Sequence, residues 1–410
     1  MPQQNQVKPG LGPLFVLLAA HLLAVALVFT GAADRFSFET RFQPERPTTL
    51  DIHVAGVRGA LSGEGFYDVG HLGAVAGPFD PMADRGTPAE IAILGAPFAL
   101  LPDGWRTPLW FLLNEILLLG AALLILRRTP RRGVAITLLA AWALGTPYLM
   151  ALATEVPVMI AALALLAVGL LEGRGAAAAF TLLAAVRPFT SGILLHALRA
   201  RRWSFATAAG IALLLTAVLF AFHPPDFHTF LGRHPYGGSY PGNLGLQAFL
   251  FSTFRNLVPD RPLSLPIAGR VIYDINILSL ILQRILVFAF LAAAALLSLR
   301  ARKRAQTGAV VALWACTWIA AGVEVREADF LLVIAGAATM AMRMPAGWLL
   351  ASAALWLALP TPFVALPQAG IESWSPEFGW TATQTMALHG WKLIPSAIVY
   401  GMAARTCYRA

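Results

Sequence analysis

Long apolar stretches recur along the chain and constrain its fold more than any other feature. They run to about 20 residues, the length an α-helix needs to cross the hydrocarbon core of a membrane. Of the 410 residues, 58% are hydrophobic and only 12% are charged, whereas a soluble domain carries roughly 25% charged residues. Because lipid offers no hydrogen-bond partners to an open backbone, helices are the expected spans. The sequence therefore predicts an all-α, polytopic integral membrane protein.

Full spans are expected near residues 12–32, 105–126, 133–148, 155–172, 203–222, 276–299, 306–323, 327–343, 346–363 and 389–405. The stretch 176–198 is interrupted by Arg187-Pro188, which leaves two halves of about 11 residues, too short to cross. These halves are expected to form a short re-entrant hairpin, and counting them gives roughly 12 membrane helices. The short apolar stretch 88–102 is expected to be re-entrant or interfacial, and 146–155 is expected to be an outer connection.

The basic residues indicate how the chain is oriented. The net charge is +9, which could suggest nucleic acid, but the positive charges cluster in short connections between spans. These connections are "RRTPRR" (127–132), "RARR" (199–202) and "RARKR" (300–304). This positive-inside pattern predicts cytoplasmic connections and two cytoplasmic termini, with no nucleic-acid partner. One membrane domain over 1–410 is expected, with outer segments near 34–104, 223–275 and 364–388.

Asp51 lies in the first outer segment, soon after the first span, and two interpretations of it are open. Thr48-x-x-Asp51 matches a capping box, in which case the helix would begin here, continue to Ser62 and end at Gly63. Alternatively, Asp51 is a general base just above the membrane surface, able to take a proton from a hydroxyl group.

Two further ionisable residues lie at or within apolar stretches. Glu155 follows Thr154 and precedes Pro157, where an acid could simply favour the helix dipole. Arg187 occupies the tip of the expected hairpin and could extend its guanidinium to the membrane surface. An ionisable residue at a membrane boundary is also a candidate functional group, and an arginine matches the oxygens of a lipid phosphate.

The second outer segment begins with a loop rich in polar and aromatic residues, "HPPDFHTFLGRHPYGGSYPGN" (223–243). Such side chains could bind a sugar, with His234, Tyr236 and Asn243 as candidates, or could form an interfacial aromatic belt. The spacing of its histidines matches no familiar zinc pattern, so no metal is expected.

The loop "EVREADF" (324–330) lies between two apolar stretches on the expected outer side. Its acidic and basic residues could pair with each other. Alternatively Glu324 and Arg326 line the roof of a cavity that opens outward.

Four segments of the chain form a familiar pattern. They are Asp51 with the turn "GEGFYD" (63–68), "TPAEIAILGAPFALLPDGWRTPLWFLLNEILLL" (87–119), "LLAAVRPFTSGILL" (182–195) and "NLGLQAFLF" (243–251). Together they resemble the GT-C superfamily of membrane glycosyltransferases, and the chain looks closest to the polyprenyl-phosphate-mannose-dependent mannosyltransferases of glycosyltransferase family 87. The resemblance covers roughly residues 12 to 260.

The resemblance implies a GT-C-like fold and transfer of a hexose, typically mannose, from a polyprenyl-phosphate donor to a lipid or glycan acceptor, with inversion. Asp51 would be the general base, and Glu155 would hold the acceptor or support Asp51. Arg187 and Arg58 would bind the donor phosphate. His53, His234, Tyr236, Asn243, Glu324 and Arg326 would contact the sugar or acceptor. No cofactor is implied. No nucleotide-binding motif is visible in the sequence, which is consistent with a donor that arrives through the membrane.

The expected location is the bacterial cytoplasmic (inner) membrane, with the active site facing outward and membrane lipids as partners. A transporter or flippase of a lipid-linked sugar is the alternative. It would place polar residues along a whole path through the bilayer, often with repeat symmetry, whereas here the polar residues crowd the expected outer side. A non-catalytic assembly subunit is a third interpretation, against which the presence of Asp51 and Glu155 argues.

Overall fold

The computed structural model describes residues 12–31, 48–67, 86–231, 243–257, 265–267, 270–272, 277–322, 325–342, 344–361 and 387–409. Within these residues the protein is helical apart from a two-stranded antiparallel hairpin formed by β1 (Leu265–Ile267) and β2 (Arg270–Ile272). The α-helices are α1 (Gly12–Phe29), α3 (Thr49–Ser62), α4 (Pro88–Ala99), α5 (Asp103–Arg128), α6 (Arg132–Ala143), α7 (Thr146–Ala153), α8 (Val158–Leu170), α9 (Gly173–Val186), α10 (Ile193–Arg199), α11 (Trp203–Phe222), α12 (Pro224–Leu231), α13 (Leu246–Leu257), α14 (Ile277–Arg300), α15 (Thr307–Ala321), α16 (Phe330–Ala341), α17 (Gly347–Ala358) and α19 (Leu393–Tyr408). Short 3₁₀-helices are η3 (Pro188–Gly192), η4 (Arg304–Gln306) and η5 (Glu327–Asp329).

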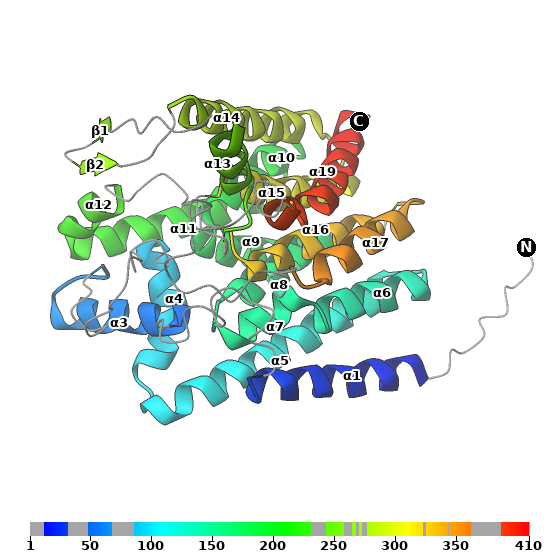
Figure 1. Ribbon diagram of the computed structural model, residues 1–410, viewed down its shortest axis with the longest axis horizontal. Helices are drawn as coiled ribbons and strands as arrows, with labels where there is room; N and C mark the ends of the chain where they lie inside the picture. Colours follow the sequence, from blue (N-terminus) through cyan, green and yellow to red (C-terminus); the bar gives the residue numbers. More distant parts are fainter. Residues whose placement is uncertain are drawn as a thin grey trace, which may run out of the picture.

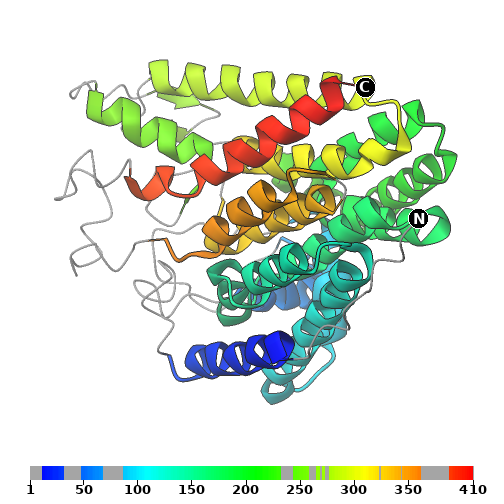
Figure 2. The ribbon, with the colours of Figure 1, turned by 90° about the vertical axis from the view of Figure 1, so that its right-hand side faces the viewer.

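The expected all-α membrane protein is confirmed. Among the described residues, five segments are long and apolar enough to cross a membrane, namely Gly12–Phe29, Asp103–Arg128, Arg132–Ala153, Trp203–Phe222 and Ile281–Arg300. Helices α1 and α14 lie at opposite edges of the bundle (Figures 1 and 2) and expose rows of large apolar side chains. In a soluble protein such faces would be a liability, whereas in a bilayer they face lipid.

The two ends of the bundle differ in character. Figure 1 shows α3, α4, α12 and the β-hairpin gathered at one end, with the start of α1 and the end of α19 at the other. We call the first the α3 end. At the opposite end lie the basic connections: Arg131 donates to the carbonyl of Pro345 at 2.8 Å, and His196 Nδ1 lies 2.8 Å from the carbonyl oxygen of Ala301.

The stretch 176–198 is interrupted where the sequence predicts it. Helix α9 ends at Val186, and η3 leads into the short helix α10. Pro188 has no N–H to continue the helical pattern, and the carbonyl of Arg187 accepts from both the amide and the hydroxyl of Thr190, at 3.0 and 2.6 Å. Arg187 is therefore held at the tip of a turn, and the chain returns through α10 to the basic end.

The segment 146–155, expected as a connection, is largely helical. Residues Thr146–Ala153 form α7, which follows α6 after a break at Gly145. Pro147 explains the restart, because its fixed φ and missing N–H suit the first turn of a helix. The helix brings Glu155 to the α3 end as the chain leaves it.

Helix α3 has both of the ends that the sequence predicts. Thr48 caps its start in a capping box with Asp51, and Gly63 ends it in a left-handed conformation at φ 85°. Leu50, Val54 and Val57 form a buried stripe that packs with α4 and α5; each such side chain contributes about 1.5–3 kcal/mol by its burial. Asp51 is turned away from this stripe.

Helix α1 contacts few other helices, and a polar cluster joins it to the bundle. His21 lies 2.9 Å from the carbonyl oxygen of Ala143 and 3.0 Å from Glu115, and the hydroxyl of Tyr148 donates to the same carboxylate at 2.8 Å. The carbonyl of Ala143 lies at the break between α6 and α7. His21 is therefore a hydrogen-bond partner for a carbonyl at the end of a helix. Only 11% of the residues of α1 are buried, and His21 is one of them.

Candidate active site

Four segments of the chain meet where α3 begins. The amide of Thr49 donates to the carbonyl of Thr154 at 3.3 Å, which brings the end of α7 against the start of α3. Arg326, from the connection before η5, donates to the hydroxyl of Thr49 at 3.3 Å. The first turn of α5 supplies the fourth segment through Arg106 and Thr107. The site is thus built from parts of the chain that lie far apart in sequence.

Asp51 uses one carboxylate oxygen for the capping box and leaves the other open. Oδ2 lies 3.3 Å from the amide nitrogen of Thr48 and 2.9 Å from its hydroxyl oxygen. Oδ1 faces the guanidinium of Arg106 at 3.8 Å, and the side chain is 44% exposed. The capping box expected from the sequence is present, and it leaves Asp51 an oxygen that another molecule can reach.

Glu155 is a nearly buried acid, only 6% exposed. Its Oε2 accepts from the hydroxyl of Thr48 and its Oε1 accepts from the hydroxyl of Thr107, both at 2.7 Å. Its backbone has a φ of 51°, a left-handed conformation that is uncommon for a residue with a side chain. Such strain costs on the order of 1–3 kcal/mol and tends to occur at functional sites.

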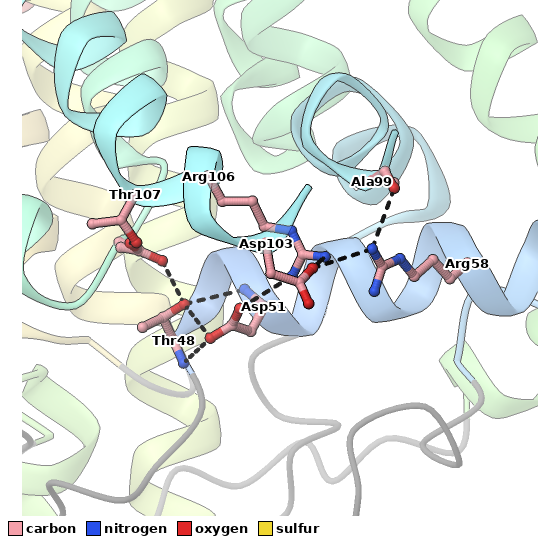
Figure 3. A network of polar contacts seen from close by, with 8 residues as sticks. Thr48, Asp51, Arg58, Ala99, Asp103, Arg106 and Thr107 are labelled. Carbon is pink, nitrogen blue, oxygen red and sulfur yellow. Dashed lines mark hydrogen bonds and ion pairs between the residues drawn. The ribbon is translucent and has the colours of Figure 1, made fainter. Parts of the chain in front are cut away.

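Arg106 is a charged neighbour of Asp51 that the sequence interpretation did not select. Arg106 pairs with Asp103 one turn earlier in α5, and Arg58 approaches the same carboxylate at 3.5 Å (Figure 3). Arg58 also donates to the carbonyl of Ala99. The two arginines therefore lie on either side of Asp103, with Arg106 next to Asp51. The signal in the sequence was an arginine in the first turn of an expected span, a position that usually indicates only an interfacial anchor.

Arg187 lies in a second group of charges. It pairs with Glu90 of α4, and its guanidinium lies 5.9 Å from the ring centroid of Trp318. Burial raises the pKa of Asp329, and the positive charges of Arg187 and Arg326 oppose this shift. Because Arg326 also donates to Thr49, this second group is connected to the one around Asp51.

Of the remaining residues predicted from the sequence, two are described and buried, and three lie outside the described residues. His53 is fully buried in α3. Asn243 is also fully buried, and its side-chain oxygen accepts from the amides of Gly245 at 3.2 Å and Val325 at 3.1 Å, which ties the start of the α13 segment to the loop that carries Arg326. His234, Tyr236 and Glu324 lie outside the described residues.

The arrangement provides one open carboxylate, one nearly buried acid and several arginines at one end of a membrane bundle. Among the residues that the structure describes, no group of three or more histidine, cysteine, aspartate or glutamate side chains could hold a metal ion. The side chains that the structure describes at the site are acidic groups, hydroxyls and arginines.

Comparison with known proteins assigns this architecture to a family. The model of glycosyltransferase family 87 matches residues 88–321, more than half of the chain. No curated protein and no solved structure gave a match. The matched region contains Arg106, Glu155 and Arg187, and it ends shortly before the loop that carries Arg326. The chain belongs to glycosyltransferase family 87 and is a membrane glycosyltransferase.

Proposed function

We propose that the protein transfers a hexose, mannose in our assignment, from a polyprenyl-phosphate donor to a hydroxyl group of a lipid or glycan acceptor. Transfer proceeds with inversion at the anomeric carbon, with Asp51 as the general base. The observation that carries the proposal is the divided use of the Asp51 carboxylate, in which Oδ2 caps α3 while Oδ1 remains open beside Arg106.

The proposed reaction needs a single base. The acceptor hydroxyl gives its proton to Asp51 Oδ1 while its oxygen bonds to the anomeric carbon. The bond from that carbon to the phosphate oxygen breaks, and polyprenyl phosphate leaves with the electron pair. A phosphate leaving group requires a cation and no general acid. One open carboxylate therefore suffices, unlike the pair of carboxyl groups that a glycosidase uses.

The distribution of charge supports an outward-facing site in a bacterial cytoplasmic membrane. The basic connections lie at the end of the bundle opposite to α3. One of them is held there by the hydrogen bond from Arg131 to the carbonyl of Pro345. Under the positive-inside rule this end is cytoplasmic, so the α3 end faces outward. Both chain termini would then be cytoplasmic. His53, His234, Tyr236, Asn243, Glu324 and Arg326 remain our proposed sugar and acceptor contacts.

Three arginines are proposed to stabilise the leaving phosphate: Arg187, Arg58 and Arg106. We expect Arg106→Gln to lower kcat/KM by about 10- to 100-fold, because loss of a charged hydrogen-bond partner costs roughly 1.5–3 kcal/mol. Arg58→Gln is the matched comparison, since both arginines contact Asp103, and a smaller loss is expected because Arg58 lies farther along α3. Steady-state kinetics with varied donor checks this order. An equal or larger effect of Arg58→Gln would reassign the phosphate site to Arg58.

The donor class can be tested on the purified protein in lipid vesicles. We expect a glycosylated product from a polyprenyl-phosphate hexose and none from the corresponding nucleotide sugar. Product with the nucleotide sugar alone would refute the donor assignment. A transporter would instead move the lipid-linked sugar between leaflets without forming a glycosidic bond. Lipid and glycan analysis of cells that lack the protein would then identify the missing product and its acceptor.

A further inference from the structure

Two helices that lie far apart in the sequence are joined beside the turn that carries Arg187. The hydroxyl of Thr87, which caps the start of α4, accepts from the amide of Glu90 at 3.1 Å and donates to the carbonyl of Ala185 at 3.2 Å. Ala185 lies in the last turn of α9, where carbonyls lack partners within the helix. The start of α4 is thereby fixed against the end of α9, two residues before Arg187.

The same joint contacts the charge of Arg187. Its guanidinium pairs with the carboxylate of Glu90 in the first turn of α4. The guanidinium also lies 5.9 Å from the ring centroid of Trp318 in α15, and this ring stacks on Phe189 with centroids 4.7 Å apart. The side chains of Arg187 and Glu90 are only 14% and 5% exposed, so salt in the solvent screens their attraction little. Segments from three helices therefore hold the guanidinium.

A glycine at position 86 makes room for the carboxylate. A Cβ atom at Gly86 would overlap the carboxyl group of Glu90, so a larger residue there would displace that group. The carbonyl of Gly86 accepts from the hydroxyl of Tyr67 at 3.0 Å, which holds the backbone in place next to the carboxylate. The position of Glu90 thus depends on the residue just before the cap of its own helix.

Asp329 is a second acid whose charge interacts with Arg187. Its carboxylate accepts from the amide of Arg326 at 2.9 Å and so caps the start of η5. This carboxylate is held by its own loop, whereas Glu90 forms the ion pair with the guanidinium. Glu90 is therefore the acid that fixes the orientation of Arg187.

Arg187 keeps hydrogen-bond donors that the ion pair does not use. An arginine has five N–H donors and no acceptor, and the pair with Glu90 engages the terminal nitrogen Nη1. Nε of Arg187 is buried and has no hydrogen-bond partner in the described part of the chain. A buried donor without a partner is costly, and an oxygen atom of a bound molecule would remove that cost. The fork of an arginine matches the oxygens of a phosphate group.

We propose that Glu90 is a positioning residue for donor binding, which holds Arg187 by Nη1 and directs its remaining N–H groups toward the phosphate of the donor. This inference rests on the proposed function, in which Arg187 stabilises that phosphate. Glu90 itself contacts neither the sugar nor the acceptor.

Binding of polyprenyl phosphate to the purified protein in detergent micelles tests the proposal by calorimetry. We expect Glu90→Leu and Arg187→Leu each to raise the Kd about tenfold, the effect of losing a charged hydrogen bond. The double variant should bind no more weakly than Arg187→Leu, because Glu90 acts through the arginine. Polyprenol lacks the phosphate, so its Kd should be the same for all of these proteins, whereas general damage to the fold would weaken both ligands. Additive effects of the two substitutions on the Kd of polyprenyl phosphate would overturn the proposal.

Two variants keep both charges and separate the carboxylate from the helix joint. In Gly86→Ala the flexible side chain of Glu90 can move aside, so the fold should persist while the Kd of polyprenyl phosphate rises about threefold. Thr87→Val is the matched comparison, because it removes the hydrogen bond to Ala185 and leaves the ion pair. It should lower the unfolding temperature without changing that Kd. Equal losses of binding in Thr87→Val and Glu90→Leu would assign the effect to the joint and overturn the proposal.

The binding data also distinguish this inference from the proposed function. If Arg187→Leu weakened the binding of polyprenyl phosphate and Glu90→Leu did not, the positioning role of Glu90 would be refuted and the phosphate site would stand. If Arg187→Leu itself had no effect, Arg187 would not be a phosphate ligand, and both the assignment of Arg187 in the proposed function and the role of Glu90 would fail.

Discussion

Replacing Asp51 with asparagine is expected to lower the rate of sugar transfer by about 100- to 10,000-fold, the usual contribution of a general base. Asparagine can replace Asp51 in the capping box, because its side-chain oxygen can still accept from Thr48. It cannot take a proton from the acceptor. The substitution therefore separates the two roles of the carboxylate, since the cap survives and the base is lost. The measurement is the initial rate of product formation, alongside the thermal unfolding curve of each protein.

Glu64→Gln is the matched control for this experiment. Glu64 is an exposed acid just beyond the other end of α3, hydrogen-bonded to the hydroxyl of Ser62 at 3.1 Å. The change removes the same charge from the same region without touching the site, so full activity is expected. If Asp51→Asn turned over as fast as Glu64→Gln, Asp51 would be a helix cap and no more.

Loss of Lys392 is expected to have the largest effect on stability. Lys392 pairs with Glu327 in the interior, and it also donates to the carbonyl of Leu357 at 2.7 Å. Glu327 further accepts from the hydroxyl of Thr361 at 2.6 Å. The pair joins η5 to the start of α19. In Lys392→Met the buried Glu327 loses its cation, which should lower the free energy of unfolding by about 3–5 kcal/mol.

The double variant Glu327→Gln/Lys392→Met is the control for that prediction. With both charges removed, no uncompensated charge remains, so the double variant should be more stable than Lys392→Met alone. Reversible unfolding in mixed micelles, followed by circular dichroism, gives both free energies. A double variant that is less stable than the single one would mean that Lys392 contributes through packing and its carbonyl contact rather than through Glu327.

Local signals in the sequence predicted the helices well. The bounds of α11 coincide with the expected 203–222, and both ends of α3 were predicted from Thr48 and Gly63. The interruption at Arg187-Pro188 was also predicted from a local signal, because a proline disrupts the helical turn in which it lies. The helical character of 146–153 was missed, because the polar residues at its ends resembled a connection although Pro147 also suits a first turn.

The site was predictable only in part, because its contacts are not local. The sequence predicts Asp51 and Glu155 as two separate candidates. Nothing in it indicates that Thr48 would contact both, because Thr48 and Glu155 are 107 positions apart. The pairing of Arg187 with Glu90 joins residues 97 positions apart. The sequence does not single out Arg106, because an arginine near the end of a span is common. Its position beside Asp51 follows from the way α5 meets α3, which only the folded structure defines.

The attachment of α1 bears on how the protein is assembled during synthesis. The carbonyl and carboxylate that His21 contacts belong to residues 122 and 94 positions later in the chain. They are therefore synthesised after α1, and until then His21 lacks both of these partners. Helix α1 can dock through His21 on the edge of the bundle only once Ala143 and Glu115 have been made.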